Sequence, residues 1–152
     1  MNFRDAELED KEFILNANKE INILSGLNDS TLESRIDKDM FEDKTCKSII
    51  AEIDGKVVGM VLYSYVYWAN CGKGIYLSQA YVKSEYRGNK LQRLICEELE
   101  KIARKDDIEI LSATASPYNE FSVNTFMNLG YEIKKDKLKY GGLRRYVLVK
   151  EL

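Results

Sequence analysis

The part of the chain best suited to chemistry is residues 82–94, where a strand pattern gives way to a helix pattern through a glycine. Gly88 stands at this change, and Arg87, Lys90 and Arg93 place three cations around it. The first N–H groups of a helix lack intrahelical acceptors and lie at the positive end of the helix dipole, so such a start binds anions. A phosphate or pyrophosphate is the expected ligand. A helix start with basic surface residues and no ligand explains the pattern equally well.

The absence of histidine restricts the acid–base chemistry that the chain can perform. With no histidine, Ser-His-Asp and Cys-His nucleophiles are excluded. A metal site would need carboxylates or thiolates alone, and no such cluster is visible, so we predict no metal. A general base has to be a carboxylate, a tyrosine, a lysine, a chain terminus or water. The three cysteines (Cys46, Cys71 and Cys96) are odd in number and widely spaced, which argues against a disulfide framework and favours a reducing cytoplasm.

The charge is divided unevenly along the chain. Residues 1–75 hold 9 Lys/Arg and 14 Asp/Glu, a net of −5, whereas residues 76–152 hold 14 and 11, a net of +3. The total of −2 argues against a nucleic-acid-binding protein, which is usually basic. The division would suit a cationic substrate at one end and an anionic ligand at the other. A chance spread of solvated surface charge is an equally good explanation.

Length and hydropathy predict one soluble unit. A chain of 152 residues is typical of a single domain, here residues 1–152. No apolar run approaches the length of a membrane span, and the acidic first ten residues argue against a signal peptide. We therefore expect a cytoplasmic protein with neither a membrane nor a nucleic acid as its partner.

The apolar periodicity predicts ten elements in the order α-α-β-β-β-α-β-α-β-β. Helices are expected at residues 9–24, from Ser30 to about Met40, at 90–105 and at 119–129. Strands are expected at residues 48–53, 56–62 with a continuation to Tyr67, 75–82, 108–115, 131–133 and 145–149. A capping box at Ser30 and Glu33 begins the second helix, and Asp54-Gly55 forms a two-residue hairpin turn. This order indicates an α/β (α+β) fold with a mixed central sheet and helices on both faces.

The segment Tyr86-Arg87-Gly88-Asn89 resembles the pyrophosphate-binding turn of the GNAT superfamily of N-acetyltransferases. Members carry an Arg/Gln-x-x-Gly-x-Gly/Ala motif at a strand-to-helix turn, and its backbone amides hold the pyrophosphate of acetyl-coenzyme A. Lys90 and Gln92 stand where the family usually has glycine. The added side chains could crowd the turn, although the charge of Lys90 favours phosphate.

The resemblance extends over about residues 50–150. The stretch from Trp68 to Leu77 is similar to the diamine (spermidine/spermine-like) branch of the superfamily, and Pro117-Tyr118-Asn119, Phe126 and Leu129-Gly130-Tyr131 match a later family motif. By resemblance, the strand before the turn carries a bulge and pairs its backbone with the pantetheine arm. The cofactor would then lie in the V between residues 75–82 and 108–115. The residues that the resemblance assigns to the cofactor are Tyr81, Val82, Arg87, Gly88, Asn89, Lys90, Leu91, Gln92, Arg93, Asn119, Ser122 and Phe126.

The catalytic residues that the resemblance leads us to expect are absent. The diamine branch has a Glu-Asp pair where this chain has Ser78 and Gln79, and much of the superfamily has a thiolate-protonating tyrosine where this chain has Phe126. Water, a flanking carboxylate or one of four tyrosines could substitute, and the sequence does not choose among them. Those tyrosines are Tyr63, Tyr65, Tyr76 and Tyr81. For any single tyrosine, packing in the core or at its rim is the better interpretation.

These features predict an acetyl-coenzyme A-dependent N-acetyltransferase that acts on the primary amine of a small molecule or of an amino-terminal substrate. The amine would approach over the first hairpin and the two amino-terminal helices, which form the acidic half of the chain. A homodimer is compatible with these features. A non-catalytic coenzyme A-binding or interaction module of the same fold is the alternative, favoured by Ser78, Gln79 and Phe126. A nucleotide-phosphate binder unrelated to acetyl transfer is a weaker alternative, because the turn is not a P-loop.

Overall fold

The computed structural model describes residues 1–26, 33–68, 72–139 and 141–152. The seven strands form one mixed sheet in the order β1-β2-β3-β4-β5-β7-β6. Among the strand pairs that the structure describes, only β4 and β5 are parallel. The strands are β1 (Asn2–Asp5), β2 (Lys47–Ile53), β3 (Lys56–Trp68), β4 (Gly72–Val82), β5 (Ile110–Ala115), β6 (Glu132–Lys139) and β7 (Leu143–Glu151).

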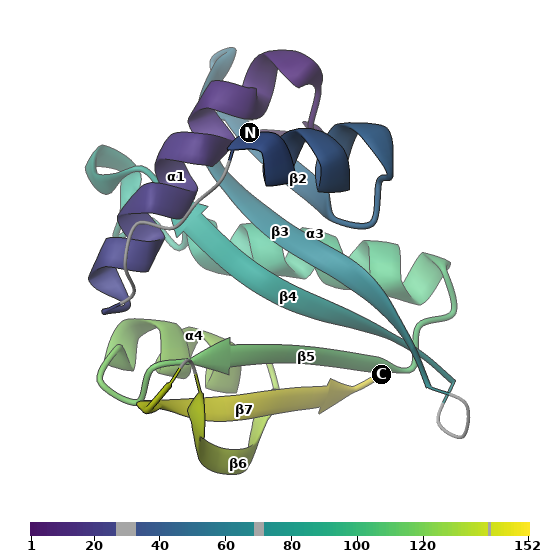
Figure 1. Cartoon of the computed structure of the whole chain (residues 1–152), viewed down its shortest axis with the longest axis vertical. Coiled ribbons are helices and arrows are strands. Elements are labelled where there is room, and N and C mark those ends of the chain that lie inside the picture. Colours follow the sequence, from purple (N-terminus) through teal and green to yellow (C-terminus); the bar gives the residue numbers. More distant parts are fainter. Residues whose placement is uncertain (27–32, 69–71, 140) are drawn as a thin grey trace.

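Helices cover both faces of this sheet, as the sequence predicts (Figure 1). They are α1 (Lys11–Leu24), α2 (Glu33–Ile36), α3 (Leu91–Lys105) and α4 (Glu120–Asn128). On one face, Ile14 of α1 and Ile36 of α2 pack on Met60 of β3. On the other face, Leu99 of α3 and Phe126 of α4 belong to a larger apolar cluster. Each helix therefore packs its apolar side against one face of the sheet, and one apolar cluster lies on each face.

One apolar side chain of α3 lies outside the buried face of the helix. Leu91, Ile95 and Leu99 are buried, whereas Leu94 is 37% exposed. Leu94 lies one residue from Ile95 and therefore about 100° around the helix, outside the buried face. The helix packs against β3 and β4 and so carries its own start to the end of β4.

The structure adds one strand that the sequence analysis does not predict. Residues 2–5 form β1, which pairs antiparallel with β2 at the edge of the sheet. Four residues are too short to show a period, so the pairing depends on tertiary contacts. Strand β6 also extends to Lys139, although seven of its eight residues are exposed and it lacks apolar alternation. Its pairing with β7 defines it.

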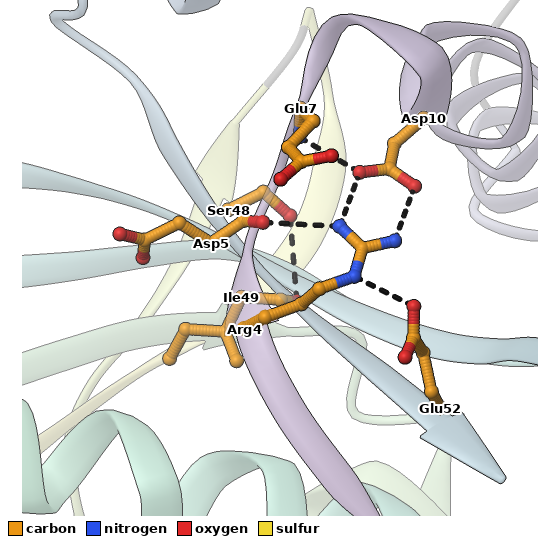
Figure 2. Close-up of polar contacts among 7 residues, drawn as sticks. All are labelled: Arg4, Asp5, Glu7, Asp10, Ser48, Ile49 and Glu52. Atoms are coloured by element: carbon orange, nitrogen blue, oxygen red, sulfur yellow. Dashed lines mark hydrogen bonds and ion pairs between the residues drawn. The ribbon is translucent and has the colours of Figure 1, made fainter. Parts of the chain in front are cut away.

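Arg4 of β1 forms hydrogen bonds with Asp10 at the start of α1 and with Glu52 of β2 (Figure 2). Its Nη1 and Nη2 donate to the two carboxylate oxygens of Asp10 at 2.7 and 2.9 Å, and its Nε donates to Glu52 at 2.6 Å. Asp10 also accepts the Glu7 N–H at 2.8 Å, and only 5% of Asp10 is exposed. This network fixes the start of α1 over the sheet. The carboxyl-terminal end of α1 then lies beside the carboxyl-terminal end of β4.

The hairpin turn between β2 and β3 is confirmed. Asp54 and Gly55 both have positive φ, at 50° and 74°. Two successive positive φ values define the type I′ turn, whose twist matches that of paired strands.

The predicted start of the second helix, Ser30 with Leu32, lies outside the described residues. The described part comprises α2 and a π-helical continuation, Asp37–Glu42. Ile36 and Met40 are buried there and belong to the apolar cluster that contains Ile14 and Met60.

Candidate active site

A bulge in β4 separates it from β5. Leu62 of β3 pairs with Gln79 and Tyr63 pairs with Leu77, so Ser78 has no partner residue on β3. The Ser78 Oγ donates to the Leu62 carbonyl at 3.2 Å. Extra residues of this kind bend a strand and increase its twist. The bulge expected in this strand is therefore present.

Beyond the bulge the two parallel strands diverge. Pairing between β4 and β5 covers only residues 74–77 and 110–113, and Figure 1 shows the strand ends separating. A cleft of about 810 Å³ occupies this region. Its walls come from the end of α1, the carboxyl-terminal halves of β4 and β5, the start of α3, α4 and one residue of β7. The V predicted from the resemblance is thus part of the fold.

Strand β4 presents backbone N–H groups to this cleft. The Lys83 N–H donates to the Val58 carbonyl at 2.9 Å, which makes the Val82–Gly59 pair a non-hydrogen-bonded one. By alternation, the N–H groups of Ala80 and Val82 point away from β3, and that of Tyr81 points toward it. An extended ligand with amide groups could pair with this edge through Ala80 and Val82. The resemblance assigns the backbone of Tyr81 and Val82 to the cofactor. Of these two residues, only Val82 has an N–H group that points away from β3.

The start of α3 opens onto the same cleft. Gly88 and Lys90 both have positive φ, at 84° and 60°, and Lys90 is the residue that precedes the helix. Neither an N-cap side-chain bond nor an acidic residue in the first turn is found there. The first N–H groups of the helix therefore remain available to an anion, as the sequence predicts.

The structure brings most of the predicted cofactor residues together. Ten of them line the cleft: Tyr81, Val82, Arg87, Gly88, Lys90, Leu91, Gln92, Asn119, Ser122 and Phe126. The other two do not line it: Asn89 donates to the Tyr86 carbonyl at 3.4 Å, and Arg93 pairs with Glu97 at 2.8 Å along α3. Contact of any of the twelve with a cofactor stays a prediction.

Asn119 begins α4, where its side chain accepts the Ser122 N–H at 3.2 Å. This contact makes Asn119 the N-cap of the helix, a position that asparagine favours. Ser122 also receives a long hydrogen bond of 3.4 Å from Gln92 of α3. These contacts set the start of α4 beside the start of α3 across the cleft.

Arg87 lies between the cleft and α1. Its Nε donates to the Val82 carbonyl at 2.8 Å, and its Nη2 pairs with Glu20 at 2.9 Å. The Tyr81 hydroxyl donates to the other oxygen of Glu20 at 2.6 Å. The hydrogen bond from Tyr81, followed by that from Arg87, holds the pKa of the Glu20 carboxyl below its usual value despite partial burial. Burial, then this bond to Glu20, raises the pKa of Tyr81 to about 12.

Of the four candidate tyrosines, only Tyr81 lines the cleft. Tyr63 is buried in the core on the α3 face, and burial raises its pKa to about 12. The Tyr65 hydroxyl donates to Asp106 at 2.7 Å, and the Tyr76 hydroxyl lies 3.1 Å from the Thr114 hydroxyl. A neutral, engaged phenol is a poor base, so none of the four is an evident catalytic base.

Phe126 packs rather than reacts. It is 3% exposed and meets the Tyr131 ring edge-on, with ring centroids 5.1 Å apart. Tyr131 is also buried and, among the described residues, does not belong to the cleft wall. No hydroxyl in this aromatic pair replaces the tyrosine expected by resemblance.

The cleft contains residues that sequence reasoning missed. Arg145 of β7 is 6% exposed and donates to the carbonyls of Ser25 and Arg144 at 2.7 and 2.8 Å. Ile21 and Leu24 of α1 join it in the wall, as does Tyr118. No local pattern marks Arg145, because it enters the site through the pairing of β7 with β5. A signal for Tyr118 existed, since it directly precedes the predicted Asn119.

The approach of the acceptor over the acidic half of the chain stays a prediction. Among the described residues that line the cleft, none is Asp or Glu, although the first half of the chain is acidic. Acidic residues of that half pair with neighbouring cations instead, as Glu33 and Asp37 do with Lys11.

A sheet opened by a bulge, with strand amides and a helix start directed into one cleft, is the architecture of an acyltransferase that binds its donor between two strands. The comparisons with known proteins agree with this class. A model described as the Acetyltransferase (GNAT) family matches residues 12–131, and the chain belongs to this family. It is accordingly a GNAT N-acetyltransferase that uses acetyl-CoA.

Solved structures share the whole fold at low identity. A ribosomal-protein-alanine N-acetyltransferase from Brucella melitensis is 23% identical with a TM-score of 0.81, and all of each chain is covered. The PaiA N-acetyltransferase of Thermoplasma acidophilum, solved with coenzyme A, is 18% identical with a TM-score of 0.70 and the same full coverage. An acetyltransferase of Clostridium acetobutylicum, solved with acetyl-CoA, is 16% identical with a TM-score of 0.74 over 91% of this chain and 94% of its own.

No curated protein sequence is a significant match to the chain. The matches do not single out the diamine branch, and residues 69–71 of the segment behind that expectation lie outside the described residues. None of the helices in the described ranges is long and apolar enough to span a membrane.

Proposed function

We propose that the protein transfers the acetyl group of acetyl-CoA to the primary amine of a small molecule or of an amino-terminal substrate. The observation that carries the proposal is the cleft between β4 and β5, into which the N–H groups of Ala80 and Val82 and the start of α3 are directed. A long phosphorylated thioester needs hydrogen-bond donors along its arm and an anion site for its phosphates. The strand N–H groups and the start of α3 offer both in one cavity.

The residues present fit this donor. Strand edges bind amide-containing ligands as an added strand, which suits the pantetheine arm along Ala80 and Val82. The N–H groups at the start of α3, with the cations of Arg87 and Lys90, suit the pyrophosphate. Asn119 and Ser122 line the cleft and would donate to the arm. Acetyl-CoA supplies a thioester whose carbonyl carbon the amine attacks.

Catalysis in this proposal depends mainly on position. No tyrosine, carboxylate or histidine of the described cleft wall is set up as a strong general base. Holding an amine and a thioester in line can contribute about 7 kcal/mol or more through proximity. Water can take the proton released from the amine and can supply the one that the thiolate needs.

Coenzyme A binding and thiol release together test the proposal. Acetyl-CoA at 100 times its dissociation constant should stabilise the fold by about 2.7 kcal/mol and so raise Tm by roughly 5–10 °C. Arg87→Ala should weaken binding by about tenfold in calorimetry, because a charge-assisted contact to phosphate contributes about 1.5 kcal/mol or more. Lys101→Ala is the matched control, since Lys101 lies on α3, pairs with Glu98 and does not line the cleft. Absence of any Tm shift at millimolar acetyl-CoA would refute the donor assignment.

A further inference from the structure

Arg87 is held by only part of its guanidinium group. Its Nε donates to the Val82 carbonyl at 2.8 Å, and its Nη2 donates to Glu20 of α1 at 2.9 Å. A guanidinium group is planar and carries five N–H donors, so two contacts at different nitrogens fix its plane. Among the residues that the structure describes, the two N–H groups of Nη1 and the second one of Nη2 have no acceptor. Arg87 lines the cleft, so these three donors are available to a ligand there.

Glu20 contacts this arginine from outside the cleft. Its Oε1 accepts the hydrogen bond from Arg87, and its Oε2 accepts the Tyr81 hydroxyl at 2.6 Å. The bond from Tyr81, followed by that from Arg87, holds the pKa of the Glu20 carboxyl below its usual value, so Glu20 is ionised near neutral pH. Glu20 is not among the described residues that line the cleft. A carboxylate that is engaged at both oxygens outside the cleft is not placed to take a proton from an acceptor amine.

Tyr81 completes this set of contacts. The Arg87 Cζ lies over the Tyr81 ring, 5.7 Å from its centroid, which is a cation–π distance. Phe13 of α1 meets the same ring edge-on, with ring centroids 5.8 Å apart. Helix α1 therefore supplies two side chains, Phe13 and Glu20, to the support of one arginine at the end of β4.

The stability of the fold does not explain the pair of Glu20 and Arg87. The two side chains are 40% and 43% exposed. Exposed ion pairs contribute little to stability, because water screens the charges and the two side chains lose conformational freedom. The contacts do fix the direction of the guanidinium group. A side chain that is ordered before a ligand arrives loses less freedom when the ligand binds.

We propose that Glu20 is a positioning residue for the donor, and that it orients the Arg87 guanidinium so that its remaining N–H groups meet the pyrophosphate of acetyl-CoA. This inference rests on the proposed function, which places the pyrophosphate at the start of α3 beside Arg87. Glu20 touches neither the donor nor the reacting atoms and acts through Arg87. Helix α1, which lies on the face of the sheet opposite α3 and α4, thereby contributes to donor affinity.

A negative charge beside Arg87 could also have the opposite effect. A carboxylate that competes with a phosphate for the same guanidinium group would weaken donor binding. The hydrogen bonds favour positioning, because Glu20 takes one N–H of Arg87 and leaves three to the ligand. The two effects predict opposite signs for the change in donor affinity when Glu20 is replaced.

Calorimetric titration with coenzyme A measures this sign. Glu20→Ala should raise the Kd about three- to tenfold, because the arginine side chain must then be ordered by the ligand. Glu20→Gln keeps one acceptor oxygen and nearly the full side-chain volume, so its Kd should lie between those of the native protein and Glu20→Ala. It also keeps the test decisive if the alanine variant does not fold. Glu12→Ala is the matched control and should leave the Kd unchanged, since Glu12 is an exposed glutamate of the same helix and does not line the cleft.

A double-mutant cycle distinguishes positioning from a purely structural role. With Arg87→Ala already present, Glu20→Ala should not change the Kd further, because no guanidinium group remains to be oriented. A structural role, in which the loss of Glu20 displaces α1 or the end of β4, would raise the Kd by the same factor with and without Arg87. The same cycle with Glu20→Gln checks the result with a smaller change of shape.

The outcomes separate the two proposals. If the native protein binds neither coenzyme A nor acetyl-CoA, the proposed function fails. If it binds them and Glu20→Ala leaves the Kd unchanged, or raises it equally in both backgrounds, only the inference about Glu20 fails. A lower Kd would overturn the inference as well, because Glu20 would then compete with the pyrophosphate for Arg87.

Discussion

Lys90 adopts a left-handed backbone conformation, with φ of 60° and ψ of 15°, at the point where α3 begins. This conformation costs a residue with a Cβ about 1 kcal/mol, and glycine avoids the cost. Gly88, two residues earlier, has φ of 84°, and a Cβ added to it would meet no atom within 4 Å. Backbone conformation, not space, therefore determines which side chains the turn accepts.

We predict opposite effects for two substitutions in this turn. Lys90→Gly should leave the free energy of unfolding unchanged or raise it by up to about 1 kcal/mol, because strain is relieved while an exposed side chain is lost. Gly88→Ala should lower it by about 1 kcal/mol through strain at positive φ. Urea titrations measure both, and a destabilised Lys90→Gly protein would mean that the lysine side chain holds the turn.

Phe126 shows how one side chain can remove an expected catalytic group without disturbing the fold. Its ring is buried against Tyr131, and it lines the cleft. A tyrosine at this position would carry the hydroxyl that, by the resemblance, much of the superfamily uses to protonate the thiolate.

We predict that Phe126→Tyr changes turnover by less than the ~10²-fold minimum typical of a general acid, because the native enzyme obtains its proton elsewhere. Thiol release by both proteins with the same panel of primary amines checks this. A silent native protein together with an active Phe126→Tyr protein would show that Phe126 had abolished catalysis.

At the scale of elements, close approach between α3 and the sheet sets the position of the α3 start. A Cβ at Gly59 of β3 would lie 2.8 Å from the Ile95 Cδ1 of α3 and 2.8 Å from the Tyr81 carbonyl oxygen. The absence of a side chain at Gly59 thus lets the helix rest against β3 and β4 while its first turn faces the cleft.

Gly59→Ala should accordingly lower the free energy of unfolding by about 1–3 kcal/mol, as overpacking of a core does. The displaced helix start should also weaken coenzyme A binding. Ile95→Val removes the Cδ1 contact, so the double variant should be more stable than the sum of the two single losses predicts. Strict additivity in thermal unfolding would contradict the proposed clash.

At the scale of the molecule, the Arg4 network joins the first strand, the first helix and the sheet edge. Its hydrogen bonds from Arg4, opposed by burial and helped by the Glu7 N–H, lower the pKa of the Asp10 carboxyl. The unfolded chain then binds more protons than the folded one near pH 4, so stability rises with pH in that range. The contribution of Asp10 is present above its unfolded pKa and is lost as the pH falls through the lower folded value.

We predict that Asp10→Asn lowers the free energy of unfolding at pH 7 by about 2–3 kcal/mol, because Arg4 loses a buried partner. The variant should also lose less stability than the native protein between pH 5 and pH 3. Asp43→Asn is the control, since Asp43 and Lys38 form an exposed pair at 3.7 Å that should contribute less than about 1 kcal/mol. Parallel pH profiles for Asp10→Asn and the native protein would exclude the linkage to Asp10.

The sequence by itself determined most of the elements and the turn that is predicted to bind an anion. Periodicity marks α1, α3 and α4, the turn at Asp54-Gly55 identifies the first hairpin, and the step from Val82 through Gly88 to Leu91 identifies the start of α3. These features depend on residues close together in the chain, whose backbone preferences and spacing act locally.

Only the tertiary structure decided the charge and the chemistry of the cleft. Arg145 lines the cleft because β7 pairs with β5. The Glu20 carboxylate accepts hydrogen bonds from Tyr81 and Arg87, which lie more than 60 residues away in the chain. The one-residue bulge at Ser78 directs Gln79 to the α1 face, and the buried Oε1 of Gln79, which has no hydrogen-bond partner among the described residues, has no local signature. The amino-terminal half is acidic, yet none of the described residues that line the cleft is Asp or Glu, because strand register and helix packing, rather than net composition, determine which side chains share a wall.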